Sequence, residues 1–393
     1  MKRFAARYLF DAVSPEPLLN GFVETGEDGT VIRVGKCNPS DEPDFYEGAL
    51  TPGFVNAHCH IELSSMKGLF RKGSGMAGFI DQINALRDTR TRDEKIGCIK
   101  AWMDTLWERG VSAMSDISNC DDSFDIKSAH PIYTRTFLEV FGTEPGDAPA
   151  VMEGVRELGR KAAEAGIDAA PTPHSPYTMS PELLTESSRE GLASGFLSYH
   201  CGESSEEEDM IRRGAGAMWE NRRRAGMSTP PVEGLSSLEY FLSRLRPIHE
   251  PPFPENVLLV HECTLDEAGA DLVKASFPNA FIALCPLSNI FIHNTLPPVP
   301  MMQSKGLRLC IGTDSLSSND DLDMVKEMFC LQENFPGLGL GEMLGWACAN
   351  GAAFLRRNEL GSFVPGKRPG VVLIDHIAPG GRLSSASRSH RLI

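Results

Sequence analysis

Short apolar runs and longer amphipathic stretches alternate over the middle of the chain. The apolar runs lie at residues 53–58, 111–117, 132–141, 167–173, 196–201, 256–262, 280–285 and 307–313. Runs of this kind, bounded by turn residues, are typical of buried strands. Stretches with helical periodicity follow most of them, for example at residues 94–109, 150–165, 181–193, 265–277 and 322–334.

Eight successive units of strand and helix predict an α/β protein with a closed (β/α)₈ TIM barrel rather than an open doubly wound sheet. No glycine-rich phosphate-binding motif follows any of the predicted strands, which weakens the nucleotide-binding alternatives. We place this barrel at residues 51–356.

The two ends of the chain differ from the middle because they contain short β-type runs without helices. These runs lie at residues 7–10, 21–24, 31–34, 361–367 and 371–374. They predict a small β-sandwich-like domain that both termini build, from residues 1–50 and 357–393. Residues 382–391 are rich in Ser and Arg, and we expect them to be frayed.

The composition narrows the possible partners. The net charge is −15, and no basic run is longer than Arg222–Arg224, which argues against nucleic acid and anionic membranes. No apolar stretch is long enough to span a membrane, and the first residues carry charge without the clean apolar run expected of a secretory leader. The ten cysteines form no CxxC pair, as expected for buried thiols in a reducing cytoplasm. We therefore expect a cytoplasmic protein that acts on a small molecule, with a homodimer as the commonest assembly.

Side chains that bind metals lie at the C-terminal ends of the predicted strands, where barrel enzymes hold their active sites. The first strand ends in His58-Cys59-His60, and residues two apart in a strand point to the same side. The fifth, sixth and eighth strands end near His200, His261 and Asp314. Imidazole and carboxylate groups suit Zn²⁺, and Fe²⁺ or Mn²⁺ nearly as well.

Each of these residues has a plainer interpretation when it is taken alone. A HxH pair can arise by chance, a single histidine can be an ordinary buried polar residue, and Asp314 can cap the next helix. All of them, however, fall at strand ends around one predicted barrel mouth. Together they predict a site for a divalent metal.

The same segments resemble the amidohydrolase superfamily, specifically its branch of cytosine- and adenosine-type deaminases and chlorohydrolases. The similar segments are residues 50–60, 174–177, 200–203, 260–263, 285–289 and 312–315. The resemblance covers essentially the whole chain, including the turn at residues 364–367. It implies a metal-dependent hydrolase, but the motifs do not specify a substrate.

The resemblance assigns roles residue by residue. It implies that the metal ligands are His58, His60, His200 and Asp314. It implies that Glu203 transfers protons and that His261 lies beside the attacking water without being a main ligand, so that the catalytic set is Glu203, His261 and Asp314. Without the resemblance, Glu203 could be a salt-bridged residue of the acidic run at 203–208.

Substrate contacts and the number of metals follow from the same comparison. We expect His174, Glu62 and Asn289 to contact the substrate, and Glu62 alternatively to orient a ligand histidine. Binuclear relatives carry a Lys or Glu at the end of strand four, whereas residues 168–174 contain neither. We therefore expect one divalent metal, with Zn²⁺ as the first choice and Fe²⁺ or Mn²⁺ as alternatives.

The chemistry of these groups favours an aminohydrolase that replaces an exocyclic amino group of an N-heterocycle or nucleoside-like molecule by oxygen and releases ammonia. A Zn²⁺-type ion lowers the pKa of water from 15.7 to about 7, and Glu203 can protonate a ring nitrogen. One alternative is a hydrolase of cyclic amides or halogenated rings. Another is a catalytically inactive binding or scaffold protein. The long connection at residues 204–236 is either a lid or a solvated helical excursion.

Overall fold

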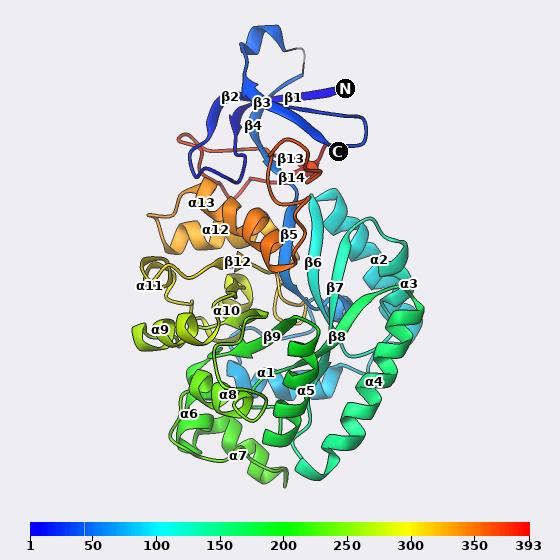
Figure 1. The fold of residues 1–393 in the computed structure, drawn as a ribbon, viewed down its shortest axis with the longest axis vertical. Coiled ribbons are helices and arrows are strands. Elements are labelled where there is room, and N and C mark those ends of the chain that lie inside the picture. Colours follow the sequence, from blue (N-terminus) through cyan, green and yellow to red (C-terminus); the bar gives the residue numbers. More distant parts are fainter. Residues whose placement is uncertain (43) are drawn as a thin grey trace.

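Two four-stranded parallel sheets form the centre of the molecule, as Figure 1 shows for the computed structural model, which describes residues 1–42 and 44–393. The first sheet has the order β5-β6-β7-β8 and contains β5 (Phe54–Cys59), β6 (Val111–Ser118), β7 (Tyr133–Val140) and β8 (Asp168–Pro173). The second has the order β12-β11-β10-β9 and contains β9 (Phe196–Cys201), β10 (Asn256–His261), β11 (Ala280–Leu284) and β12 (Leu309–Ile311).

All eight predicted strands are present in the structure. Strands β6, β10 and β11 are buried along their whole length, because helices cover one side and the opposite row of side chains covers the other. This explains why they read as continuous apolar runs rather than alternating ones. The largest difference is in β12, which begins at Leu309 instead of residue 307 and ends at Ile311.

The edges of the two parallel sheets meet at two seams. At one seam the Thr172 hydroxyl donates to the Ser198 carbonyl at 2.6 Å and accepts the Ser198 N–H at 2.9 Å. At the other seam the N–H groups of Thr313 and Asp314 both donate to the His58 carbonyl at 3.0 Å. A Cβ at Gly312 would lie 2.8 Å from that carbonyl oxygen, so the close approach requires glycine. The C-terminal ends of β5 and β12 are thereby held side by side.

The helices surround these sheets (Figure 1). They are α1 (Gly75–Leu86), α2 (Arg92–Glu108), α3 (Phe124–Ala129), α4 (Ala148–Glu164), α5 (Pro181–Ala193), α6 (Ser205–Arg213), α7 (Gly216–Arg224), α8 (Ser237–Leu245), α9 (Glu267–Ser276), α10 (Pro286–His293), α11 (Val299–Ser304), α12 (Met324–Asn334), α13 (Leu340–Leu344) and α14 (Gly351–Phe354). The five predicted helices correspond to α2, α4, α5, α9 and α12. Thr91 begins α2 with a capping box that includes Glu94. None of the helices in the described residues combines the length and the apolar character needed to cross a membrane.

The two ends of the chain build one six-stranded sheet, in which both termini lie at the same end of the molecule (Figure 1). Its order is β14-β13-β4-β1-β2-β3, with β1 (Lys2–Leu9), β2 (Leu18–Thr25), β3 (Val31–Lys36), β4 (Phe45–Pro52), β13 (Val371–Ile374) and β14 (Ser389–Arg391). The expectation of a sandwich-like pair of sheets is therefore wrong for the described residues. The strands form a single sheet because β4 pairs with β1 on one side and with β13 on the other.

The expectation that residues 382–391 are frayed is also wrong. Strand β14 pairs antiparallel with β13, and Ser387 and Ser389 are buried. The Arg391 guanidinium lies 3.7 Å from the centroid of the Trp107 ring and donates to the Trp107 carbonyl at 2.8 Å. A Ser/Arg-rich sequence suggests solvation, but this cation–π contact and the β-ladder anchor the segment.

Candidate metal centre and active site

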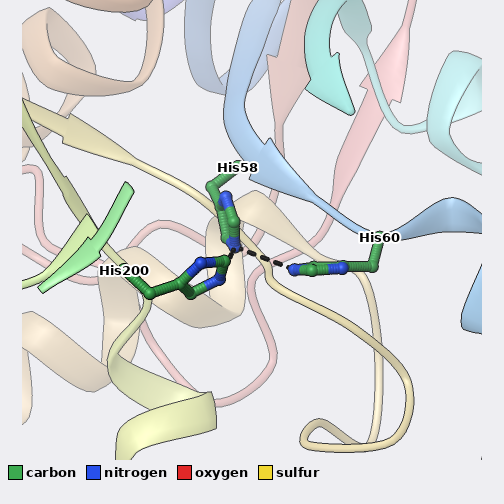
Figure 2. A group of neighbouring side chains, drawn as sticks. All are labelled: His58, His60 and His200. Carbon is green, nitrogen blue, oxygen red and sulfur yellow. Dashed lines mark hydrogen bonds between the residues drawn. The ribbon is translucent and has the colours of Figure 1, made fainter. Parts of the chain in front are cut away.

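Three histidines point their Nε2 atoms toward one another: His58 on β5, His60 just after this strand, and His200 on β9 (Figure 2). The Nε2 atom of His58 lies 3.1 Å from those of His60 and His200. The Oδ1 atom of Asp314 lies 3.7 Å from His58 Nε2 and 3.5 Å from His60 Nε2. All four side chains are buried. The structure thus brings the four predicted metal ligands together.

The local chain geometry explains how these groups meet. Alternation along β5 puts His58 and His60 on the same side, and the Ile61 N–H behind them donates to buried Asp116 at 2.8 Å. Asp314 has a φ of 55°, the left-handed region that few non-glycine residues adopt. The Ser288 hydroxyl donates to its Oδ2 atom at 2.6 Å, which leaves Oδ1 facing the histidines.

The donor set fits a divalent cation. Three imidazole nitrogens, two of them 3.1 Å from the third, cannot all be satisfied by shared protons. Nitrogens around a tetrahedral zinc with Zn–N bonds near 2.0–2.1 Å lie roughly 3.3 Å apart, close to this spacing. His200 donates its Nδ1–H to the His174 carbonyl at 3.1 Å, so its Nε2 lone pair is free for a metal.

The protonation states of these groups also suit metal binding. Burial lowers the pKa of His58 and His200 well below the usual value, so both rings are neutral. Burial acts to raise the pKa of Asp314, but the nearby histidines and the Ser288 hydrogen bond outweigh burial and lower that pKa to about 2. Neutral imidazoles and an ionised carboxylate are the forms that bind metals.

A carboxylic acid lies beside this cluster on the segment after β9. The Tyr177 hydroxyl donates to Glu203 Oε2 at 2.9 Å, and Glu203 Oε1 lies 3.4 Å from His261 Nε2. Burial, together with the charge of Asp314, raises the pKa of Glu203 to about 8. Glu203 is therefore protonated at neutral pH in the metal-free protein, as a general acid must be. A divalent cation nearby would lower this pKa.

His261 is oriented from behind. The Asn289 amide donates to His261 Nδ1 at 3.1 Å, so the proton of the neutral ring is on Nε2. Burial lowers the pKa of His261 to about 4, which keeps the ring neutral. Its Nε2 atom lies 4.0 Å from Asp314 Oδ2. His261 thus presents an N–H donor, rather than a lone pair, to the groups around the metal ligands.

A cavity of about 190 Å³ opens onto these groups. Its polar part includes His60, His200, Glu203, His261 and Asp314. An apolar part comes from α1 and from neighbouring residues, namely Met76, Phe79, Ile80, Ile83, Leu63, Phe141 and Ile292. Few polar groups at one end of an otherwise apolar pocket are typical of a small-molecule site.

The three predicted substrate contacts have different positions. Glu62 and His174 both line the cavity. Burial raises the pKa of Glu62 to about 7, and its Oε2 atom accepts the Asn119 N–H at 2.8 Å. Asn289 is fully buried behind His261 and is not among the cavity-lining residues. Its contact in the structure is with His261 Nδ1, and its role as a substrate contact stays a prediction.

Sequence reasoning missed several residues of this cavity. Tyr177 lies in a segment that resembles the family, but its contact with Glu203 depends on the tertiary structure. Glu139, near the end of β7, also lines the cavity, with Oε2 bonded to the Asn119 amide at 2.9 Å and Oε1 buried without a hydrogen-bond partner. Its position at a strand end was the available signal.

The connection at residues 204–236 forms α6 and α7 and contributes no residue to the cavity lining in the described chain. Glu206 on α6 accepts the N–H groups of Met76 and Ala77, at 2.8 and 3.1 Å. These are free donors at the start of α1, where a carboxylate is favourable. The segment therefore acts on the site indirectly, by holding the helix that forms the apolar wall.

Comparison with known proteins agrees with this geometry. The model of the amidohydrolase family matches residues 49–388. A protein of Syntrophomonas wolfei subsp. wolfei named 5-methylthioadenosine/S-adenosylhomocysteine deaminase is 26% identical over 406 residues, covering 95% of this chain and 87% of that protein.

Solved structures show the same fold. Helicobacter pylori aminofutalosine deaminase in complex with methylthio-coformycin has a TM-score of 0.75 and 21% identity, covering 95% of this chain and 92% of that chain. An adenosine deaminase from Xanthomonas campestris with bound zinc has a TM-score of 0.66 and 18% identity, covering 95% of this chain and 84% of that chain. The resemblance found in the sequence is confirmed, and the chain belongs to the amidohydrolase family as a metal-dependent hydrolase that acts on C–N bonds.

Proposed function

We propose that this enzyme deaminates a purine ribonucleoside of the adenosine type, replacing the exocyclic amino group by oxygen and releasing ammonia. The observation that carries the proposal is Glu203, which Tyr177 holds beside His261 and the four candidate metal ligands. A deaminase must protonate the ring while water attacks the adjacent carbon, and this acid is placed for that step.

We further propose that one divalent metal, most simply Zn²⁺, binds to His58, His60, His200 and Asp314, with Fe²⁺ or Mn²⁺ as alternatives. A second group of potential ligands, His58 with His261 and Asp314, shares two residues with this site, and a third, Glu139 with His174, also uses His200. Because His200 has only Nε2 available, it can serve either the proposed site or the third group. The zinc of the Xanthomonas campestris structure supports the choice of metal.

For the fold we propose that the eight parallel strands form one (β/α)₈ barrel closed at both seams. For the domains, we propose a barrel at residues 51–356 and a small β-domain at residues 1–50 plus 357–393. A homodimer and a cytoplasmic location stay predictions from the sequence.

In the proposed reaction, each residue has one task. When bound, Zn²⁺ supplies a nucleophilic water at neutral pH, because it lowers the pKa of water to about 7. Asp314 accepts the proton of the attacking water. His261 donates its Nε2–H to the oxygen that develops negative charge. Glu203 donates its proton to the ring nitrogen next to the attacked carbon, which makes that carbon electrophilic. The C–N bond then breaks: the amino group leaves as ammonia with the proton that Asp314 accepted, and the proton of the new hydroxyl returns to Glu203, which leaves a C=O group.

The ribose part of the proposal rests on Glu139 and His174. Glu139 Oε1 is buried without a partner, and His174 Nε2 lies 3.6 Å from it. Both residues line the cavity. A buried acceptor without a partner is costly unless a ligand supplies a donor. The two hydroxyls of a ribose would satisfy it, which agrees with the nucleoside names of the relatives.

The proposal is tested by measuring ammonia release from a panel of rings. The panel contains adenosine, 5′-methylthioadenosine and an aminofutalosine-type nucleoside, with adenine, guanine, cytosine and aminopterins for comparison. We expect turnover of the nucleosides and a large loss for the 2′-deoxy and 3′-deoxy forms. Turnover of cyclic amides or halogenated rings with none of the amino-substituted rings would overturn the deaminase proposal.

Metal content gives a separate prediction. Purified protein supplied with zinc should hold one equivalent, because His58, His60 and His200 form one group of potential ligands and Asp314 lies 3.5–3.7 Å from two of them. Elemental analysis measures this value. Two tightly held equivalents would contradict the single site, and far less than one equivalent would favour an inactive homologue.

The pH dependence provides another prediction. The raised pKa of Glu203, about 8, means that the acid is protonated below this value and is lost as the pH rises through it. We expect kcat/KM to fall on the alkaline side with a midpoint at or below about 8, since the metal lowers the pKa. A pH profile of kcat/KM checks this expectation. The residual activity of Glu203→Gln should not show this fall on the alkaline limb of the profile. An identical limb in the variant would assign it to another group.

A further inference from the structure

One face of α1 forms the apolar wall of the cavity from its depth to its mouth. The lining residues Met76, Phe79, Ile80, Ile83, Asn84 and Arg87 recur at spacings of three and four, as one helical face requires. Met76 is 1% exposed, whereas Asn84 is exposed and Arg87 is half-buried. At 1.5 Å per residue this face of α1, from Met76 to Arg87, spans roughly 16 Å. It leads outward from the buried polar groups to Arg87.

Arg87 differs from the neighbouring arginines because no carboxylate forms an ion pair with it in the described chain. Among the described residues that line the cavity it is the only arginine or lysine. Its guanidinium lies 5.5 Å from the centroid of Phe141, which is 39% exposed at the same mouth. Neighbouring arginines are paired: Arg90 lies 3.7 Å from Glu94, and Arg92 lies 2.7 Å from Asp122. In the described chain no carboxylate lies within ion-pair distance of Arg87, although the protein carries a net charge of −15.

We propose that Arg87 binds a carboxylate on the part of the substrate that extends out of the cavity. The inference rests on the proposed nucleoside deaminase function and adds the chemistry of the substrate's outer arm. That arm would be apolar where it passes Ile80 and Ile83 and anionic at its end. A planar guanidinium binds a carboxylate through two parallel hydrogen bonds, and Phe141 supplies an apolar surface beside it.

The plainer role for Arg87 is structural. It is the C-cap residue of α1, where a positive charge is favourable because the helix dipole is negative at that end. A structural role predicts a change in stability that is independent of the charge of the substrate. A binding role predicts a change in selectivity between charged and neutral substrates. The two roles are therefore separable by kinetics.

The experiment compares two nucleosides that differ in one charge. They are 5′-S-(4-carboxybutyl)-5′-thioadenosine and its methyl ester, assayed with the zinc-loaded enzyme. In the wild-type enzyme we expect kcat/KM for the acid to exceed that for the ester by roughly 10- to 100-fold, the usual worth of charge-assisted hydrogen bonds. In Arg87→Met this ratio should fall to about one. Arg90→Met removes the same charge outside the cavity and should keep the wild-type ratio.

Each result supports or overturns the inference. A ratio near one in the wild-type enzyme, with both nucleosides turned over, would overturn the anionic subsite and leave the deaminase proposal intact. An unchanged ratio in Arg87→Met would also overturn it, even if thermal unfolding showed a loss of stability. If neither nucleoside were turned over while another ring was, the proposed nucleoside function would fail, and this inference would fail with it.

Discussion

Glu203→Gln is expected to lower turnover by roughly 10²–10⁴-fold while the zinc content stays at the wild-type level. The amide keeps the shape of the side chain and can still accept the Tyr177 hydrogen bond, which is 2.9 Å long in the structure. It has no proton of suitable acidity for the ring nitrogen. The expected loss corresponds to roughly 3–5 kcal/mol of activation free energy. Steady-state kinetics and elemental analysis of the same preparation measure both quantities.

The control for this variant is Glu220→Gln, which removes an exposed carboxylate of α7 outside the cavity. It should retain wild-type turnover. Loss of the metal from Glu203→Gln would mean that Glu203 is a ligand rather than an acid. Turnover close to that of the wild type would contradict the role of Glu203 as proton donor, on which the deaminase proposal rests.

His200→Ala is expected to remove most of the metal and to reduce turnover to the background rate. Zinc sites with three or four protein ligands have none to spare, and binding of the ion contributes directly to folding stability. His200 lies 3.1 Å from His58 through the two Nε2 atoms, so its loss opens the cluster on one side. We expect zinc content well below one equivalent, and a thermal unfolding midpoint that no longer rises when zinc is added.

Two histidine variants control for the loss of an imidazole. His261→Ala should retain the metal and lose rate, because His261 Nε2 carries a proton and faces Glu203. His249 is exposed and lies outside the cavity, so His249→Ala should behave like the wild type. If His200→Ala bound a full equivalent of zinc, the ligand assignment would be wrong. The group of His58, His261 and Asp314, which does not include His200, would then need to be tested in the same way.

Several parts of the site were predictable from local patterns. The HxH pair is visible because residues two apart on a strand share a side. His200, His261 and Asp314 stand out because parallel strands of a barrel end at one face, so that polar residues after buried runs converge. The same reasoning did not foresee the contact of Asn289 with His261, since a sequence does not show whether a side chain at a strand end points into the cavity or behind a neighbouring histidine.

The sequence by itself determined the eight strands and five of the longer helices, but not α1, because burial imposes periodicities that a single segment displays. Only the tertiary structure decided what lies between segments distant along the chain. It paired Tyr177 with Glu203, left Glu139 Oε1 without a partner, and turned one face of α1 into a wall that ends at Arg87. It also anchored the Ser/Arg-rich segment through Arg391 on Trp107. Contacts of this kind depend on side-chain direction and packing across the fold, which no local periodicity encodes.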